Sequence, residues 1–501
     1  MADMGMKASG VHPSRNPRER WSWRRRFVVA LAVLAILLAL PSWVLHRAGR
    51  IRRQSEIDAI RAAGEPMTFE DLDALRGSIP DAQNAARRIV PLFDRLDAHE
   101  LPPLPVVGGG HGLWSELGVR YNAEMIGAIE AFLEMRQEVL AELHAAAALG
   151  RGVFPIEWAD DGFSTLLPHL SPVRAASKLL GLEAMVRAHR GNMDGAMASC
   201  ESMFGVAACI ENEPFLVSLL VRCACESLAI ETVQRVLALG EPDEAWLRTF
   251  HTRLQRLGDD NALLLQTFFG ERAIVMAFFS SARAGAVSPM TPGIGGSQIS
   301  IMQVVPGFVD LNEQKYLQIM RARCDAARLP LGEAWPRMKE LDGEFANLWF
   351  YHVLTRMILP SFSRVTEMYV RGRVHVRAAV AGIEIELYRR ANGRWPATLE
   401  EAFADDPARI PLDPFNANAP MRYIVDETGC TIYSVGPDET DDGGAIEGAS
   451  STPPNDIGFR LLSPPLRGAT VTTQPVDKAV WEAIEALRSP TTTQPPSPDA
   501  P

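Results

Sequence analysis

The sequence predicts a mainly α-helical protein with an N-terminal transmembrane helix, an irregular body of αα-hairpins, and a small C-terminal α+β module with an antiparallel sheet. Three observations lead to this fold class. A long uncharged apolar segment lies near the N-terminus, helical periodicity dominates the central part, and strand-like segments follow near the C-terminus. With 47% hydrophobic and 22% charged residues, the chain is neither disordered nor a multi-span membrane protein.

These patterns divide the 501 residues into five parts. They are a basic cytoplasmic tail (1–26), a transmembrane signal anchor (27–45), a helical body (54–373), an α+β module (374–462) and a Pro/Thr-rich tail (463–501). The last thirteen residues, SPTTTQPPSPDAP, have the composition of a disordered segment.

Charge is distributed unevenly along the chain. Residues 1–53 hold 11 Lys and Arg against 2 acids, a net charge of +9, whereas the remainder holds 39 against 59, a net charge of −20. Nucleic-acid binding requires clustered Lys and Arg, which the acidic remainder does not show, so we expect no nucleic-acid partner.

The apolar segment 27–45, FVVALAVLAILLALPSWVL, contains 19 residues without a charge. At about 1.5 Å of rise per residue, such a helix comes close to the hydrocarbon core of a bilayer, roughly 30 Å thick. Seven basic residues precede it, and Trp21, Trp23 and Trp43 lie where interfacial aromatic residues belong. We therefore expect a single-pass protein of the cell inner membrane, with a cytoplasmic N-terminus and the bulk of the chain in the periplasm.

Two alternatives to an anchor are a cleaved signal peptide and a buried core helix. The apolar stretch is longer than the h-region of an ordinary signal peptide, and no A-x-A cleavage site follows it. The arginine clusters at both of its ends argue against a core helix. An uncleaved signal anchor is our interpretation.

The helical body, 54–373, shows apolar residues at helical spacing and residues typical of helix ends. Thr68 and Asp71 form a capping-box-like helix start, and the segments 113–149, 172–284 and 310–390 show helical periodicity. A Gly/Pro/Ser-rich loop over 285–308 interrupts them. The spacing of small residues in 179–206 resembles a tetratricopeptide-repeat hairpin, but no second copy follows at that period, which favours an irregular stack of αα-hairpins.

The motifs that mark common catalytic sites are missing from the sequence. It contains no H-E-x-x-H, G-x-S-x-G, S-x-x-K or P-loop pattern. Paired acids such as Glu384 and Glu386 fit a solvated helix face. The six cysteines form no C-x-x-C pair and are expected to be small buried hydrophobic residues, although a disulfide stays open for a periplasmic body. The sequence therefore identifies no catalytic residue and no small-molecule substrate.

The C-terminal module begins with a helix from Val374 that ends at Gly393. Thr398 and Glu401 then form a capping box for a short second helix. Strands are predicted over 421–425 and 430–435, joined by a four-residue loop that ends in glycine, with a third strand over 457–462. The pattern predicts a helix packed on a small antiparallel sheet.

The order of these pieces resembles the globular domain of the major pseudopilin of type II secretion systems. The matching residues lie within 374–460 and are Tyr388, 393–396, Leu399, Glu400, 412–415, Tyr423, 433–438 and 455–457. The whole layout is also similar to that of membrane-anchored proteins of planctomycete-type bacteria. The sequence has no prepilin-peptidase site, and more than 300 residues separate the apolar segment from the module. The resemblance therefore implies the fold and the calcium site of that domain, and not assembly by the pilin route.

An acidic loop over 434–456 is the candidate calcium site. It contains six acids and no Lys or Arg, and Ca²⁺ prefers several carboxylate and carbonyl oxygens. From spacing alone, a solvated acidic loop and a cation site both stay open. The resemblance implies calcium, with Asp438 and Asp456 as the first carboxylate ligands and Asp441, Asp442 and the carbonyl of Ser434 as the next.

The sequence thus predicts a membrane-anchored envelope protein that binds or scaffolds other envelope proteins. A component of a type II secretion-like apparatus is the alternative, because of the module. An envelope enzyme without a recognised motif is a third hypothesis.

Overall fold

The computed structural model describes residues 18–96, 104, 116–258, 261–284, 307–446, 456–473, 475–476 and 478–488. The first part of the predicted basic tail, most of the predicted loop over 285–308, Glu447 and the last thirteen residues lie outside the described residues.

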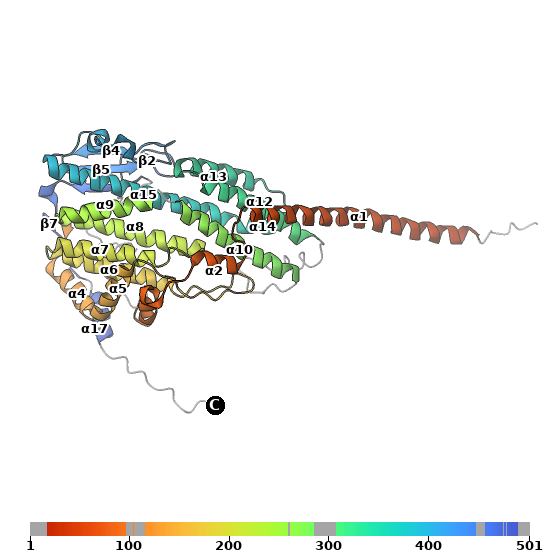
Figure 1. The fold of residues 1–501 in the computed structure, drawn as a ribbon, viewed down its shortest axis with the longest axis horizontal. Helices are drawn as coiled ribbons and strands as arrows, with labels where there is room; N and C mark the ends of the chain where they lie inside the picture. Colours follow the sequence, from red (N-terminus) through yellow and green to blue (C-terminus); the bar gives the residue numbers. More distant parts are fainter. Residues whose placement is uncertain are drawn as a thin grey trace, which may run out of the picture.

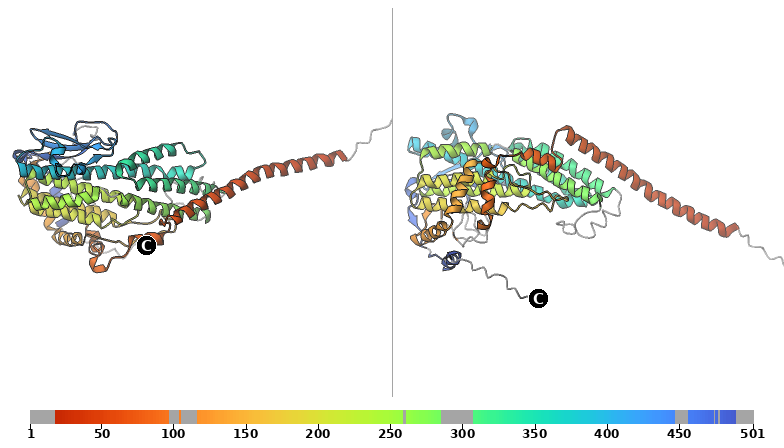
Figure 2. Two further views of the ribbon diagram at one scale, coloured as in Figure 1. Left: turned by 45° about the horizontal axis from the view of Figure 1, so that its top comes forward. Right: turned by 60° about the horizontal axis from the view of Figure 1, so that its bottom comes forward.

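Helices build most of the described chain, as the sequence predicted (Figure 1). The first of them extends away from the body at one end, and the others lie mainly along the long axis of the body (Figure 2). In the N-terminal half they are α1 (Arg18–Ala62), α2 (Phe69–Arg76), α3 (Ala86–Ile89), α4 (Ala123–Glu134), α5 (Gln137–Leu149), α6 (Leu170–His189), α7 (Met193–Ala208), α8 (Leu216–Leu239) and α9 (Glu244–Gly258). In the C-terminal half they are α10 (Ala262–Ala284), α12 (Phe308–Ala327), α13 (Leu331–Ala346), α14 (Val353–Ile358), α15 (Pro360–Asn392), α16 (Leu399–Ala402) and α17 (Lys478–Arg488).

Local capping explains where several of these helices begin and end. Thr68 and Asp71 form the predicted capping box of α2, since each side chain accepts a hydrogen bond from the backbone at the other's position. A threonine cap recurs at α16, where the side chain of Thr398 accepts from the backbone N–H of Glu401. Gly393 ends α15 in the left-handed conformation with φ of 70°, as predicted.

Successive helices in the middle of the body pair as αα-hairpins. α6 and α7 pack on each other along their lengths, and α8 packs against both. The turn between α6 and α7 uses Gly191 at φ of 82°, a conformation that favours glycine, and Asn192 caps α7 by accepting from the N–H of Gly195.

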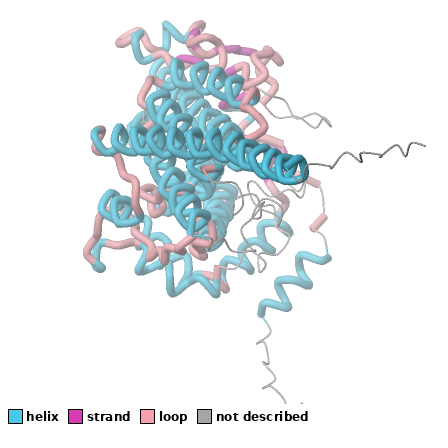
Figure 3. Tube along the Cα trace, turned by 90° about the vertical axis from the view of Figure 1, so that its right-hand side faces the viewer, coloured by secondary structure: helices cyan, strands magenta, loops and turns pink. Residues whose placement is uncertain are grey.

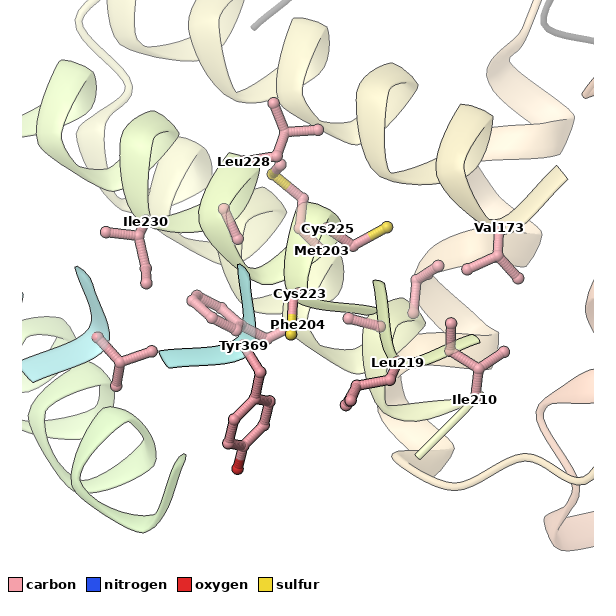
Figure 4. Close-up of a cluster of buried hydrophobic side chains, with 14 of the residues drawn as sticks. Val173, Met203, Phe204, Ile210, Leu219, Cys223, Cys225, Leu228, Ile230 and Tyr369 are labelled. Carbon is pink, nitrogen blue, oxygen red and sulfur yellow. The ribbon is translucent and has the colours of Figure 1, made fainter. Parts of the chain in front are cut away.

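All six cysteines are buried and free, as expected for small apolar side chains. Figure 4 shows Cys223 and Cys225 of α8 in the core beside Met203 and Phe204 of α7, with Tyr369 of α15 close by. Burial raises the pKa of the Cys225 thiol to about 12, so it stays protonated at neutral pH.

The predicted antiparallel sheet is present and consists of β4 (Arg422–Asp426), β5 (Gly429–Ser434) and β6 (Ile457–Leu462), in the order β4-β5-β6. Seen from the end at which α1 leaves the body, the strands gather along one edge of the helical bundle (Figure 3). The sheet packs on α15, where a Cβ at Gly382 would overlap the ring of Phe459. Glycine at this position lets the helix and strand approach closely.

Helix α15 continues without a break through the predicted boundary between 373 and 374. One buried cluster includes apolar residues of both the helices and the sheet. A short parallel pair, β1 (Val119–Arg120) with β7 (Thr470–Val471), also joins distant parts of the chain. Helices and sheet therefore share one continuous core.

At Gly270, helix α10 lies close against the segment that precedes α8. A Cβ at this position would overlap the carbonyl oxygen of Pro214, which belongs to the backbone and cannot rotate away. We expect Gly270→Ala to lower the free energy of unfolding by about 1–3 kcal/mol. The measurement is the urea midpoint of the purified protein.

Gly343→Ala is the matched control, because Gly343 also lies inside a helix but has open space around its Cβ position. This change is expected to raise the free energy of unfolding by about 0.5–1 kcal/mol. Equal effects of the two substitutions would contradict the steric explanation.

Candidate functional site

The acidic loop follows β5 and returns to β6, so its candidate ligands lie at one end of the sheet. Asp438, Asp441 and Asp442 are exposed, whereas Ser434 and Asp456 are buried. Asp441 pairs with Arg422, accepts a hydrogen bond from the hydroxyl of Tyr433 at 3.1 Å, and accepts from the N–H of Gly443 at 3.0 Å. These contacts hold its carboxylate within the loop.

Asp456 is the most distinctive carboxylate of the loop. It is 4% exposed, its Oδ2 accepts from the N–H of Gly444 at 2.8 Å, and its Oδ1 is buried with no hydrogen-bond partner among the described residues. Burial, together with the charges of Asp442 and Asp441, raises the pKa of this carboxyl above its usual range. A cation would satisfy the second oxygen and offset the repulsion.

The described residues do not include a group of three or more His, Cys, Asp or Glu side chains placed to hold a metal ion. Asp441 and Asp456 bind neighbouring backbone groups of the loop, because they accept hydrogen bonds from the N–H groups of Gly443 and Gly444 respectively. It places Asp438 at the start of the loop, where its side chain accepts from the N–H of Thr440 at 3.3 Å. Glu447 lies outside the described residues.

Asp413 was not among the predicted ligands, although it belongs to the segment 412–415 (L-D-P-F) that carries part of the pseudopilin resemblance. It is buried and accepts hydrogen bonds from the hydroxyl of Ser434 at 2.7 Å and from the N–H groups of Phe415 and Val435. These bonds join β2 (Leu412–Asp413), which pairs with β3 (Ala419–Pro420), to the end of β5. Ser434 therefore has a structural role through its hydroxyl.

A Ser–His–Glu arrangement that the sequence did not indicate lies between α5, α6 and α7. His144 contacts the hydroxyl of Ser202 at 2.7 Å through Nδ1 and the carboxylate of Glu183 at 2.8 Å through Nε2. A serine, a histidine and a carboxylate are also the residue types of a hydrolase catalytic triad. However, Ser202 lies inside α7, and its hydroxyl also donates to the carbonyl of Ala198.

Backbone N–H groups inside an α-helix already donate to carbonyls four residues earlier, so they offer no oxyanion hole beside Ser202. Glu183 is also bound by Arg187 and Ser199. Burial alone raises the pKa of Glu183, but the bonds from His144 and Ser199 and the charge of Arg187 outweigh it and lower that pKa. We interpret this cluster as a polar link that holds three helices together.

The prediction of a solvated face for Glu384 and Glu386 is wrong. Glu384 lies 2.9 Å from Nε2 of His251, and the side chain of Glu386 is fully buried. Glu386 accepts hydrogen bonds from Arg389, Arg390 and Arg467. The reason is that the segment after β6 folds back over this face of α15 and supplies Arg467 as a buried partner.

A second buried ionic cluster borders a cavity between α7, α8 and α9. Glu226 pairs with Arg222 at 2.7 Å and with Arg373, and all three side chains are at most 4% exposed. The cavity has a volume of about 620 Å³. Its charged lining consists of Arg222, Arg248, Arg253, Arg256, Glu201, Glu211 and Glu226.

The lining of this cavity contains one more arginine than glutamate. Four arginines face three glutamates, and Nη1 of Arg222 is buried with no hydrogen-bond acceptor among the described residues. Arg253 is held by Glu201 at 3.0 Å, whereas Arg256 is exposed at the rim. Carboxylate and phosphate groups match guanidinium donors in geometry.

The predicted anchor over 27–45 belongs to α1, and part of its side chains lies outside the described ones. The described apolar side chains Phe27, Val28, Val29, Leu31 and Val33 are 48–65% exposed. Within the described residues, one helix, α10, is long and apolar enough to cross a membrane, and 61% of its most apolar stretch is buried inside the protein. α10 is therefore explained as a core helix.

Comparisons with protein-family models, curated proteins and solved structures return no match to this chain.

Proposed function

We propose that the protein is a single-pass, membrane-anchored envelope protein whose helical body binds other envelope proteins. The observation that carries the proposal is α1, one continuous helix in which exposed apolar residues precede the part that packs on α12. An exposed apolar helix surface is typical of a membrane span.

Ion pairs fasten the second part of α1 and the segment after it to the body. Arg53 pairs with Glu313 at 2.6 Å, and Glu56 pairs with Arg321 at 2.7 Å. Glu65 contacts Arg272 at 2.5 Å. Because these contacts fix the helix, the body would be held close to the membrane surface.

Charging the centre of the apolar segment tests the anchor. Leu34→Arg is expected to cost roughly 2.5–3.5 kcal/mol of insertion free energy and to move protein from the carbonate-resistant membrane fraction to the soluble fraction. Ile51→Arg is the control, since Ile51 lies on the same helix beyond the apolar segment and is 61% exposed. A mature chain that starts near residue 46 would contradict an uncleaved anchor.

A reporter at the C-terminus that is active only outside the cytoplasm tests the orientation. Activity is expected, because the basic residues before the apolar segment favour a cytoplasmic N-terminus. If only a reporter that works inside the cytoplasm is active, the predicted orientation is wrong and the body faces the cytoplasm.

We place the binding role of the body at the arginine-lined cavity, with an acidic group of a partner protein as its occupant. A partner co-purified from detergent-solubilised membranes should be lost with Arg256→Glu, which reverses the charge at the rim. It should be retained with Arg488→Glu, a change at an exposed arginine of α17. Loss with both variants would indicate a general charge effect and not use of the cavity.

We propose calcium as a stabilising ligand of the acidic loop, supported by the unpartnered oxygen of Asp456 among the described residues. If Ca²⁺ binds only the folded chain, a hundredfold excess over Kd adds about 2.7 kcal/mol of stability. The melting temperature of the full chain should then rise with millimolar calcium and less with magnesium. Asp456→Ala should abolish the rise, and Glu439→Gln should keep it, because Glu439 pairs with Lys339 outside the loop.

Identical melting curves in calcium and in chelator, at matched ionic strength, would leave a solvated acidic loop as the explanation.

The alternative function, a component of a type II secretion-like apparatus, is favoured by the antiparallel sheet packed on a long helix. Co-purification of pseudopilin-like subunits would support that alternative.

A further inference from the structure

Three consecutive aromatic residues are exposed in the turn between α13 and α14. Trp349 is 67% exposed, Phe350 is 79% exposed and Tyr351 is 38% exposed. We call these three residues the aromatic turn. Large exposed apolar groups on neighbouring positions are typical of interaction sites.

Local contacts hold the aromatic turn in shape. The rings of Trp349 and Tyr351 stack with centroids 6.2 Å apart, and Phe350 meets Tyr351 edge-on at 5.7 Å. Asn312 of α12 donates to the carbonyl of Tyr351 at 3.1 Å. The hydroxyl of Thr355 in turn donates to the carbonyl of Asn312 at 2.9 Å.

These contacts place the aromatic turn at the end of the body from which α1 leaves. Gly49 of α1 lies against Asp310 and Leu311, in the first turn of α12 and next to Asn312. Figure 1 shows α14 close to the point where α1 leaves the body. The apolar segment ends at Leu45, four residues before Gly49, which is about 6 Å along a helix axis.

Three exposed arginines lie on the two helices near this end of the body. Arg47 and Arg50 follow the apolar segment on α1, and Arg356 lies on α14 beside exposed Met357. Trp and Tyr concentrate at membrane interfaces because their rings are apolar and their polar atoms stay hydrated. Arginines near them attract anionic lipid headgroups.

We infer that the aromatic turn inserts into the headgroup region of the bilayer that holds α1, so that this end of the body lies on the membrane surface. The inference rests on the proposed anchor and adds a second contact with the lipid. The commitment to lipid comes from the short distance along α1 between the apolar segment and the residues that position the turn.

A fluorescent label at position 350 of the full chain tests this contact. All six native cysteines are buried, so Phe350→Cys offers an accessible thiol to a nitrobenzoxadiazole label. Val471→Cys is the control, since Val471 is 56% exposed in β7, at the opposite end of the body (Figure 1). Both proteins are reconstituted into vesicles of phosphatidylethanolamine and phosphatidylglycerol.

The label at 350 should emit at shorter wavelength, resist quenching by iodide and be quenched by lipids with a nitroxide on the upper acyl chain. The label at 471 should emit at the wavelength typical of water, be quenched by iodide and not be quenched by the nitroxide lipids. A water-like signal at 350, in vesicles whose protein resists carbonate extraction, would overturn the inference and leave the anchor intact. Extraction by carbonate would overturn the anchor, and the inference with it.

Shielding at 350 without quenching by the nitroxide lipids would show that protein covers the turn, and would also overturn the lipid assignment. A second reporter at Met357→Cys tests the role of the rings. Its shielding should be lost when Trp349 and Phe350 are both replaced by serine, a change at exposed positions that leaves the core intact. Unchanged shielding would contradict a role for these rings.

Discussion

Glu226→Gln is expected to lower the free energy of unfolding by roughly 3–5 kcal/mol, because it leaves two buried guanidinium groups without their shared counter-charge. Glu226 lies between Arg222 of α8 and Arg373 of α15, and Arg373 also donates to the carbonyl of Leu257 at 2.7 Å. Burial by itself raises the pKa of Glu226, but the charges of Arg373 and Arg222 outweigh it and lower that pKa. The carboxylate is therefore ionised in the folded protein.

Glu244→Gln is the control for this prediction. Glu244 pairs with Arg248 on α9, but both side chains are about half exposed or more, so the loss should stay within ~0.5 kcal/mol. Urea unfolding of both variants, with equal slopes, measures the difference. A loss below about 1 kcal/mol in Glu226→Gln would mean that water reaches the two arginines.

Glu386→Gln is expected to destabilise the protein by a similar amount and to change its response to acid. Arg467, which follows β6, meets Glu386 of α15 at 2.8 Å, and Arg389 and Arg390 bind the same carboxylate. Burial alone raises the pKa of Glu386, but hydrogen bonds from Arg389 and Arg467 lower it from 4.5 to about 2. The difference corresponds to stability on the order of 3 kcal/mol.

The direction of the pH dependence follows from the lowered pKa of Glu386 in the folded state. The contribution of Glu386 is present in full above pH 4.5 and is lost as the pH falls toward about 2, because the unfolded chain takes up the proton first. Between these values the free energy of unfolding should fall more steeply in the wild-type protein than in Glu386→Gln. Parallel curves for the two proteins over this range would contradict the assignment.

Much of the secondary structure could be predicted because its signals are local. The capping residues Thr68 and Thr398 act within three positions, and Gly393 ends its helix through its own φ. The strands β5 and β6 agree closely with the predicted ranges, because short apolar segments bounded by turn residues favour extended structure. The free, buried cysteines follow from the apolar helices that contain most of them.

The candidate sites were less predictable, since charge in a sequence does not reveal burial. The local sequence around Glu386 is compatible with a solvated helix face. Its burial depends on Arg467, which lies 81 residues later in the chain. Glu226 and Arg373 are 147 residues apart, so no local spacing marks their cluster or the cavity beside it. The composition of the sequence revealed the acidic loop, but it did not reveal that Asp456 is buried.

By itself, the sequence determined the mainly helical fold class, the ends of several helices and the small antiparallel sheet, because capping, periodicity and turns act over a few residues. Only the tertiary structure decided which charges are buried, how β1 pairs with β7, and that α12 contacts both α1 and the aromatic turn. These features join segments far apart in the chain, and their stability depends on partners that come together only when the core has formed.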